Sequence, residues 1–327
     1  MQHYLKSINW ILTYKCNLKC THCDIWNNPY KNEASISDIK KILQSKIITK
    51  SYEKYWDMFD VAISWWEPLL ITNLKKVITE IDKIVPNSIH CISTNWVLID
   101  KLIDLIIFWW KKWKSFRKIN ISIDWNKINH DIQRWTKWIF NETIKNIIKF
   151  KKIFPNQIIE IKLTITKNNY NDILYISKLA DKLWVFFSFK PVENMNNYTN
   201  QSSQNITSFS NIEIKQIENQ IINNPYIKKQ NFYINPIFFN SIPEYLRNWL
   251  WKRKKDCTIA KNTLTIMPDL KVYSCILMNS TWDLNNNNLD EIWSWNSLQK
   301  QIKEIEKWKC PECMLMCWSF KSKETYE

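Results

Sequence analysis

Residues 13–23 read T-Y-K-C-N-L-K-C-T-H-C, and this stretch decides how the rest of the chain is interpreted. It follows an apolar run at residues 8–13, which we predict to be a β-strand. The stretch holds three cysteines at C-x3-C-x2-C spacing: Cys16, Cys20 and Cys23. Thiols at this spacing can hold three corners of a [4Fe–4S] cluster and leave one iron without a protein ligand. The alternative is a zinc site with His22 as fourth ligand, although zinc usually takes its cysteines in paired C-x2-C units.

Beyond this loop, apolar strand-like runs alternate with segments of helical period. The expected strands cover residues 8–13, 59–64, 89–93, 119–123, 158–165 and 185–189. The expected helices cover residues 37–46, 73–84, 101–108, 141–154 and 171–183. Strands separated by helices form parallel sheets with right-handed crossovers, and a closed eightfold barrel would need two more such units. We therefore predict an α/β fold, an open and partial (β/α)6 barrel of the TIM type, which binds ligands at the carboxyl ends of its strands.

The composition divides the chain into three parts. Residues 1–192 form the expected barrel, and residues 193–256 form a linker with bridging helices that begins in a polar, low-complexity stretch. Residues 257–327 read as a small domain with little apolar core, a kind that depends on a metal. It contains five cysteines: Cys257, Cys275, Cys310, Cys313 and Cys317. Within it, T-I-M-P-D-L-K-V-Y-S-C at residues 265–275 has the pattern of a β-hairpin.

Composition also bounds the compartment and the partners. Nine cysteines in a chain without a secretory signal favour metal or redox chemistry over disulfides. The longest apolar stretch, residues 102–110, is far shorter than the ~20 residues that span a bilayer. We therefore expect a cytoplasmic protein with no membrane partner. The net charge of +15 comes from lysines spread along the chain, so nucleic acid is not the expected partner, while an RNA or an acidic peptide stays open as a substrate.

Glycine is absent from the 327 residues, whereas tryptophan occurs 20 times. An ordinary chain carries about 7% glycine, because glycine serves tight turns and backbone that approaches a ligand. The tryptophans fall at such places. The loops after the second, third and fourth expected strands read S-W-W-E-P (64–68), S-T-N-W (93–96), S-I-D-W (122–125) and H-D-I-Q-R-W (130–135).

With glycine in place of tryptophan, these loops and the cysteine loop resemble the radical S-adenosylmethionine (SAM) superfamily over nearly the whole chain. Family members carry Gly-Gly-Glu-Pro after the second strand, Ser-Thr-Asn-Gly after the third, and Ser-Ile-Asp-Gly and His-Asp-x-x-Arg-Gly after the fourth. The resemblance leads to the hypothesis that most tryptophans are misread glycines, encoded by UGA in a lineage that uses this codon for glycine. Trp10, Trp26 and Trp293 stand where the family tolerates aromatic residues, and we expect them to be genuine.

The resemblance implies a cofactor set. Cys16, Cys20 and Cys23 would ligate the SAM-binding [4Fe–4S] cluster. The segment Trp65, Trp66 and Glu67 would hold the methionine amino end of SAM, and Arg134 its carboxylate. The full set of implied SAM-binding residues, with Ser122 and Asp124 at the ribose and His22 at the adenine, is His22, Trp65, Trp66, Glu67, Asn95, Ser122, Asp124 and Arg134.

The C-terminal cysteines resemble the SPASM domain or the shorter Twitch domain, which bind auxiliary [4Fe–4S] clusters. The resemblance implies one auxiliary cluster with Cys257, Cys275 and Cys313 as ligands, and with Cys310 or Cys317 in the fourth place. Leu270 departs from the pattern, since it stands where the hairpin usually turns on glycine. A zinc ribbon is the alternative, because its paired cysteines look similar.

The expected function is reductive cleavage of SAM to a 5′-deoxyadenosyl radical that abstracts a substrate hydrogen. The resemblance favours a peptide or protein substrate and implies a reductant protein such as flavodoxin or ferredoxin as a partner. A small-molecule substrate, as in cofactor assembly, is the alternative within the same class. A non-catalytic zinc-binding protein that holds RNA on its basic surface is the alternative from another class. No residue is singled out as a catalytic acid or base.

Overall fold

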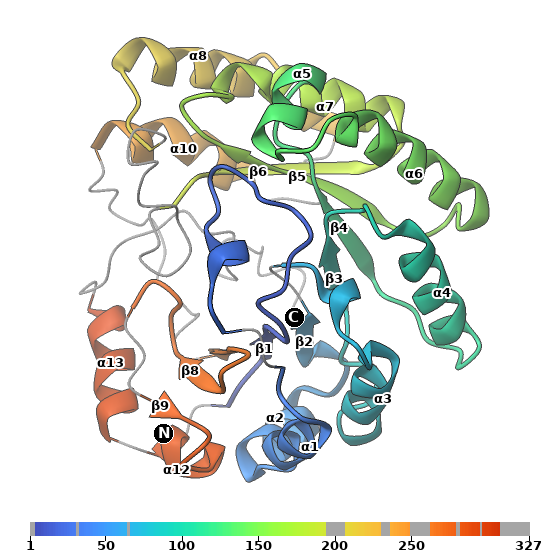
Figure 1. The fold of residues 1–327 in the computed structure, drawn as a ribbon. Coiled ribbons are helices and arrows are strands. Elements are labelled where there is room, and N and C mark those ends of the chain that lie inside the picture. Colours follow the sequence, from blue (N-terminus) through green and yellow to red (C-terminus); the bar gives the residue numbers. More distant parts are fainter. Residues whose placement is uncertain are drawn as a thin grey trace.

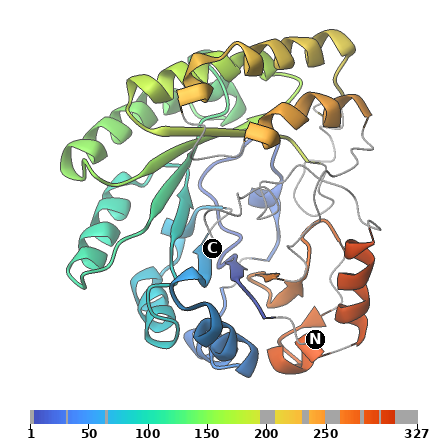
Figure 2. The ribbon, with the colours of Figure 1, turned by 180° about the vertical axis from the view of Figure 1, so that it is seen from behind.

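The computed structural model describes residues 4–30, 33–63, 66–193, 207–229, 236–248, 262–278, 282–294 and 296–307. At the centre of this part lies a nine-stranded sheet in the order β6-β5-β4-β3-β2-β1-β7-β8-β9 (Figure 1). The sheet curves without closing, with helices on its outer side and the loop after β1 within the curve (Figures 1 and 2).

The first six strands are parallel and follow one another in chain order across the sheet. They are β1 (Ser7–Trp10), β2 (Asp60–Ile63), β3 (Cys91–Thr94), β4 (Lys118–Ser122), β5 (Ile159–Ile165) and β6 (Phe186–Pro191). All six predicted strands are present, and the sheet is open. The predicted α/β partial barrel is confirmed.

Helices connect the strands and cover the outer face of the sheet (Figure 2). The α-helices of this part are α1 (Ile36–Leu43), α2 (Lys46–Tyr55), α3 (Leu74–Ile84), α4 (Ile99–Trp110), α5 (Lys127–Gln133), α6 (Ile139–Ile153) and α7 (Ile173–Lys182). The 3-10 turns are η1 (Ile25–Asn27), η2 (Trp56–Met58), η3 (Pro68–Leu70) and η4 (Tyr170–Asp172). After β6 follow α8 (Asn211–Ile222), α9 (Pro225–Lys229) and α10 (Pro236–Asn248).

The helix boundaries differ from the predicted ones for local reasons. The helix expected over residues 37–46 begins earlier, because Ser35 caps α1 by accepting from the Asp38 amide in a capping box. That helix ends at Leu43, and α2 begins after Ser45 as a helix of its own. Helix α6 begins at Ile139 rather than at residue 141.

The two faces of the sheet differ in chemistry, because successive side chains of a strand point to opposite faces. Ile119, Ile121 and Ile161 are almost fully buried in the main hydrophobic core, which also includes side chains of α3, α4, α6 and α7. Residues between them on the inner face are polar, as Asn120 and Glu160 illustrate. The outer face therefore supplies the hydrophobic core, whereas the inner face of β4 and β5 carries polar side chains.

The C-terminal elements extend the same sheet beyond β1, at the edge opposite β6. Strand β7 (Thr263–Ile266) pairs in parallel with β1, and β8 (Lys271–Tyr273) and β9 (Trp282–Asp283) continue antiparallel. Helices α12 (Leu289–Ser294) and α13 (Asn296–Glu306) follow. The predicted hairpin is confirmed as β7–β8. Leu270 in its turn has a φ of 65°, a conformation that favours glycine.

Positive φ angles concentrate on tryptophan. Among the described residues, the tryptophans with positive φ are Trp56, Trp96, Trp113, Trp135, Trp138 and Trp184, joined only by Asn87 and Leu270. For a residue with a Cβ, the left-handed conformation costs roughly 1–2 kcal/mol. The backbone at these six positions therefore has the form that glycine adopts most readily.

Trp184 and Trp135 each follow a helix end with the hydrogen-bond pattern of a Schellman motif. After α7, the Trp184 amide donates to the Asp181 carbonyl at 3.1 Å, and the Val185 amide donates to the Ala180 carbonyl at 3.0 Å. After α5, the Trp135 amide donates to Ile132 O at 3.1 Å and the next amide to Asp131 O at 3.1 Å. In this motif the residue just past the helix is usually glycine.

In the described part of the chain, the helices are too short or too polar to cross a membrane.

Candidate active site at the carboxyl edge of the sheet

The cysteine loop follows β1 at the carboxyl edge of the parallel strands. Its Thr21 amide donates to the Gln133 carbonyl of α5 at 2.9 Å, and its Cys23 amide donates to Cys20 O at 3.0 Å. Cys16 and Cys23 pack against a second apolar cluster, formed by Ile11, Tyr14, Ile25, Trp66, Met267, Tyr273 and Ile276. The loop is thus held between α5 on one side and the C-terminal hairpin on the other.

The three thiols of the loop lie close enough to influence one another. Burial raises the pKa of Cys16 to about 11 and that of Cys23 to about 12, and the charge of Cys20 adds to the rise at both. Among the described residues, no three His, Cys, Asp or Glu side chains gather round a single point that could hold one metal ion. A [4Fe–4S] cluster does not need such a point, because it distributes its thiolates over separate irons. Three thiols on one half-buried loop fit that donor set.

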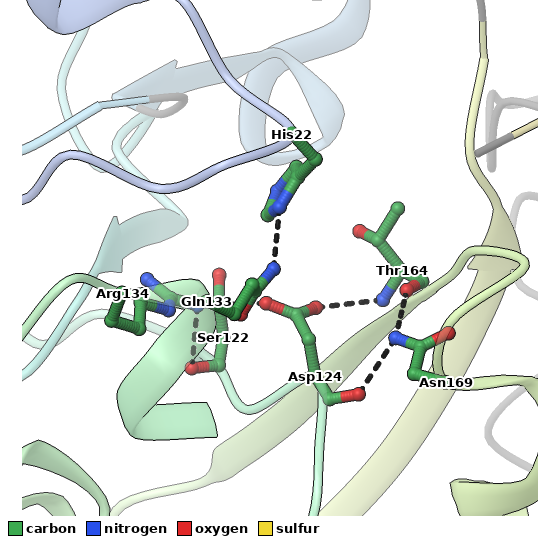
Figure 3. Close-up of polar contacts among 7 residues, drawn as sticks. All are labelled: His22, Ser122, Asp124, Gln133, Arg134, Thr164 and Asn169. Atoms are coloured by element: carbon green, nitrogen blue, oxygen red, sulfur yellow. Dashed lines mark hydrogen bonds and ion pairs between the residues drawn. The ribbon is translucent and has the colours of Figure 1, made fainter. Parts of the chain in front are cut away.

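A buried ion pair lies beside the loop. Arg134 Nη2 is 2.8 Å from Asp124 Oδ2 and donates to the Ser122 carbonyl oxygen at 3.1 Å (Figure 3). Burial alone would lower the pKa of Arg134, but the negative charges of Cys20, Asp124 and Cys16 raise it above its ordinary value. Arg134 Nε is buried without a hydrogen-bond partner among the described residues. The guanidinium therefore has one buried donor, Nε, whose acceptor is not among the described residues.

Asp124 is fixed on its other side by the end of β5. Its Oδ1 accepts from the Thr164 amide at 2.8 Å, and its backbone carbonyl accepts from Asn169 Nδ2 at 2.7 Å (Figure 3). Asn169 also bonds the Thr164 carbonyl at 2.8 Å. Burial opposes ionisation of Asp124, but chiefly the Arg134 charge holds the pKa of its carboxyl below the usual range. The aspartate is thus an anion of fixed position.

His22 joins the cysteine loop to the same cluster. Its Nδ1 forms a short hydrogen bond with Gln133 Nε2, next to Arg134 (Figure 3). Burial is the main cause that lowers the pKa of His22, while the Asp124 charge opposes it and the charges of Arg134 and Lys190 add to it. The imidazole is therefore held neutral, with one nitrogen engaged by the amide.

Glu67 organises the loops after β2 and β3. Its carboxylate accepts from the Thr94 hydroxyl at 2.8 and 2.9 Å, from the Asn95 amide at 2.8 Å and from the Leu69 amide at 3.2 Å. Burial raises the pKa of Glu67 to about 7, although these bonds oppose the rise. Asn95 Nδ2 in turn donates to Asn17 Oδ1 of the cysteine loop at 2.6 Å. Glu67 thereby positions a residue that touches the cysteine loop.

Most of the predicted SAM-site residues lie close together at the carboxyl edge of the sheet. Ser122 ends β4, Asp124 and Arg134 form the ion pair beyond it, and Glu67 with Asn95 lies on the neighbouring loops. Trp66 is buried, and its ring lies 5.0 Å from that of Tyr14. Cys275, a predicted auxiliary ligand, follows β8 and is half-buried. The predicted site residues that lie outside the described part are Trp65, Cys257, Cys310, Cys313 and Cys317.

Several contributors are not predicted from the sequence. They include Asn17, Thr94, Gln133, Thr164 and Asn169. Gln133 lies within the H-D-x-x-R motif and Asn17 follows Cys16, so their positions in or beside the motifs are the available signals. Thr164 and Asn169 belong to no motif: Thr164 acts through its backbone amide near the end of β5, and Asn169 donates its side-chain Nδ2 from the loop that follows.

Solved structures share this fold at low sequence identity. A structure of hexahistidine-tagged anSMEcpe with bound AdoMet, which is SAM, has a TM-score of 0.63 and 16% identity, covering 95% of this chain and 85% of that chain. A structure of native anSMEcpe with bound AdoMet and the Cp18Cys peptide has a TM-score of 0.61 and 16% identity, covering 91% and 83%. The structure of BtrN with AdoMet and 2-DOIA has a TM-score of 0.48 and 12% identity over 100% and 98%. No family description and no curated protein matches the sequence.

Proposed function

We propose that this protein is a radical SAM enzyme. One observation carries the proposal: a loop with C-x3-C-x2-C spacing lies at the carboxyl edge of an open parallel barrel, against both the Arg134–Asp124 pair and the Glu67–Asn95 contact. The edge thus offers thiols for iron, a guanidinium for a carboxylate and polar groups for a nucleoside. The likeness in fold to anSMEcpe with bound AdoMet supports the same reading.

Different residues of the chain would hold the iron–sulfur cluster and SAM. Cys16, Cys20 and Cys23 would hold a [4Fe–4S] cluster. When bound, that cluster supplies one electron to SAM, whose cleavage yields methionine and the 5′-deoxyadenosyl radical that removes a substrate hydrogen. Arg134 Nε would meet the SAM carboxylate, a charge-assisted bond that fixes orientation. Glu67 would act by holding Asn95 in place.

Tryptophan stands for glycine at most positions of this sequence, in our proposal. The support is the backbone: Trp96 has a φ of 63° in the Ser-Thr-Asn-x loop, Trp135 has 51° after Arg134, and Trp184 has 55° after α7. Trp113 and Trp184 also expose 97% and 85% of their surface, unlike tryptophans retained for packing. Trp10 and Trp293, expected to be genuine, are helix or strand residues buried in the core.

The recoding proposal has a direct test. The mass of peptides that contain residues 96, 135 and 184, taken from the protein made in its natural host, distinguishes glycine from tryptophan at each place. Glycine at all three supports the proposal, and tryptophan at all three ends it. Residue 10 is the internal control, because tryptophan is expected there in either case.

We also propose three units, residues 1–192, 193–256 and 257–327, with an auxiliary [4Fe–4S] cluster in the last. The β7–β8 hairpin and Cys275, two residues after the end of β8, support this assignment. The proposed ligands are four of Cys257, Cys275, Cys310, Cys313 and Cys317. A protein such as flavodoxin or ferredoxin would supply the electron, and the proposed place of action is the cytoplasm.

The proposed substrate is a peptide or protein. Support comes from the structure of anSMEcpe with AdoMet and the Cp18Cys peptide, whose fold resembles this chain. The substrate would approach the inner side of the sheet, where the cysteine loop and the ends of β4 to β6 face one another (Figure 1).

Cysteine substitution tests the cluster assignment. The full chain in its glycine form is reconstituted anaerobically with iron and sulfide, and its iron content and reduced electron paramagnetic resonance spectrum are recorded with and without SAM. The Cys16→Ala/Cys20→Ala/Cys23→Ala variant is expected to lose one cluster and every SAM-dependent change in the spectrum. Cys91→Ala is the matched control, since Cys91 lies on β3, away from the cysteine loop, and its thiol accepts from Asn120 Nδ2. Zinc without iron in the unsubstituted chain would contradict the proposal.

A further inference from the structure

The inner face of β4, β5 and β6 carries an excess of positive charge. Because side chains alternate along a strand, the residues between the buried isoleucines and phenylalanines belong to this face. Its charged members on the three strands are Lys118, Glu160, Lys162 and Lys190. On the same face of β2, Asp60 has its own partner, with Oδ1 3.4 Å from His90 Nδ1.

Burial would raise the pKa of the Glu160 carboxyl, but the charges of Lys118 and Lys162 hold it below the usual range. Glu160 Oε2 lies 2.5 Å from Lys118 Nζ, and the carboxylate is almost fully buried. Lys162 is the next inner-face residue of β5 toward the site, and its Nζ forms neither an ion pair nor a hydrogen bond within the described residues. Burial raises the pKa of Cys91, another inner-face residue, and the charge of Lys162 opposes this rise.

The sheet register places Lys162 directly below the candidate site. Lys162 lies opposite Ser122 on β4 and opposite Ser188 on β6. Two residues further toward the carboxyl edge, Lys190 lies opposite Thr164, whose amide holds Asp124. Lys162 and Lys190 thus place two positive charges on the inner face of β5 and β6, between the middle of these strands and the candidate site.

We propose that Lys162 binds an oxyanion of the substrate, with Lys190 adding positive charge between it and the site. The substrate class is therefore an acidic one, a carboxylate or a phosphate monoester. This inference rests on the proposed function, because it assumes that the substrate carbon lies at the edge where SAM binds. An ammonium on a polar wall, with no hydrogen-bond acceptor among the described residues, favours an anion and disfavours a cation of similar shape.

Two acidic probes and their neutral analogues test the inference. The full chain in its glycine form, reconstituted and loaded with SAM, is titrated by calorimetry with glutarate, glutaramide, phenyl phosphate and phenol. The variants are Lys162→Met and Lys162→Arg. Lys182→Met is the matched control, since Lys182 is an exposed lysine in the last turn of α7.

The expected result is binding of at least one acidic probe, with an affinity about tenfold weaker in Lys162→Met. Lys162→Arg keeps the charge and should retain the preference for the acidic probe over its neutral analogue, which also shows that the site is folded. Preference for glutarate identifies a carboxylate substrate, and preference for phenyl phosphate a phosphate. Equal affinity in Lys162→Met and Lys182→Met, or no preference for either acid over its neutral analogue, overturns the inference.

Release of 5′-deoxyadenosine by the unsubstituted chain is measured in the same preparation. If no 5′-deoxyadenosine is released, the proposed function is contradicted, whatever the anion titrations show. If SAM is cleaved but Lys162→Met binds the acidic probes as well as the unsubstituted chain does, the proposed function stands and the role of Lys162 is overturned.

Discussion

Arg134 and Asp124 form a 2.8 Å ion pair in which the side chains are 6% and 2% exposed. The pair joins the end of α5 to the loop after β4, directly beside the cysteine loop. Two charges in such a place need each other, because either alone would be a buried ion without compensation. Removal of either partner alone should therefore destabilise this edge, and in the proposed function the pair sets the charge that SAM would meet.

Removal of the arginine tests how far the fold depends on the pair. Arg134→Met should lower the free energy of unfolding by about 3 kcal/mol, since it leaves the Asp124 carboxylate buried and unpaired. Arg247→Met is the control, because Arg247 pairs with Glu218 on the partly exposed surface and its loss should cost less than about 1 kcal/mol. Urea unfolding measures both. Equal losses would show that the buried pair contributes no more than an exposed one.

Glu67 should make stability depend on pH. Its pKa is about 7 in the folded protein, against an ordinary value of 4.5, so between these values the folded state binds more protons than the unfolded state. Stability should therefore fall as pH rises from 4.5 to 7, by about 3 kcal/mol from this group. Glu67→Gln has no carboxyl to titrate and should lose this contribution. Unfolding curves at pH 4.5, 6 and 7.5 decide, and parallel profiles of the two proteins would contradict the assignment.

The backbone at Trp184 should prefer glycine. Trp184→Gly removes the Cβ at a φ of 55° and an exposed indole, so stability should rise by about 1 kcal/mol. Trp110→Gly is the matched control: Trp110 is helical, and its ring packs against Phe154 at 4.8 Å. There glycine should cost about 1 kcal/mol. Thermal unfolding of both variants gives the signs, and the same sign at both positions would contradict the argument from φ.

Asp290 should couple the C-terminal segment to the barrel. Its carboxylate accepts from the Lys46 amide at 2.9 Å and the Ile47 amide at 2.7 Å, so α12 caps α2. Asp290→Ala should cost about 1 kcal/mol of stability. Asp104→Ala, which breaks a surface pair with Lys75, should change stability by less than about 0.5 kcal/mol. Urea unfolding compares them, and no difference would mean that the cap does not form in solution.

The six parallel strands could be predicted from the sequence, since strands buried in parallel sheets are continuous apolar runs. Helix α5 could not be predicted from the sequence, because Ile128 and Ile132 are 72% and 63% exposed and the remaining residues of the helix are polar. No apolar stripe marks such a helix. Strand β1 ends at Trp10, three residues before the predicted end at residue 13, because the chain leaves the sheet to form the cysteine loop.

The candidate site was predictable only as separate motifs. The cysteine spacing and the loops after three strands named Arg134, Asp124 and Glu67, but not the contacts among them. The bonds from Glu67 to Thr94 and from Asn95 to Asn17 link different loops, and no local pattern records such pairs. The parallel pairing of β7 with β1 joins segments about 250 residues apart, so it too became visible only in the fold.

The central claim is that this edge cleaves SAM when glycine replaces the tryptophans. The direct measurement is 5′-deoxyadenosine released under dithionite by two anaerobically reconstituted versions of the chain. One keeps tryptophan, and the other has glycine at Trp65, Trp66, Trp96, Trp125, Trp135, Trp138, Trp184, Trp282 and Trp318. Release by the glycine version alone is the predicted result. A glycine version that binds iron but releases no 5′-deoxyadenosine would contradict the account.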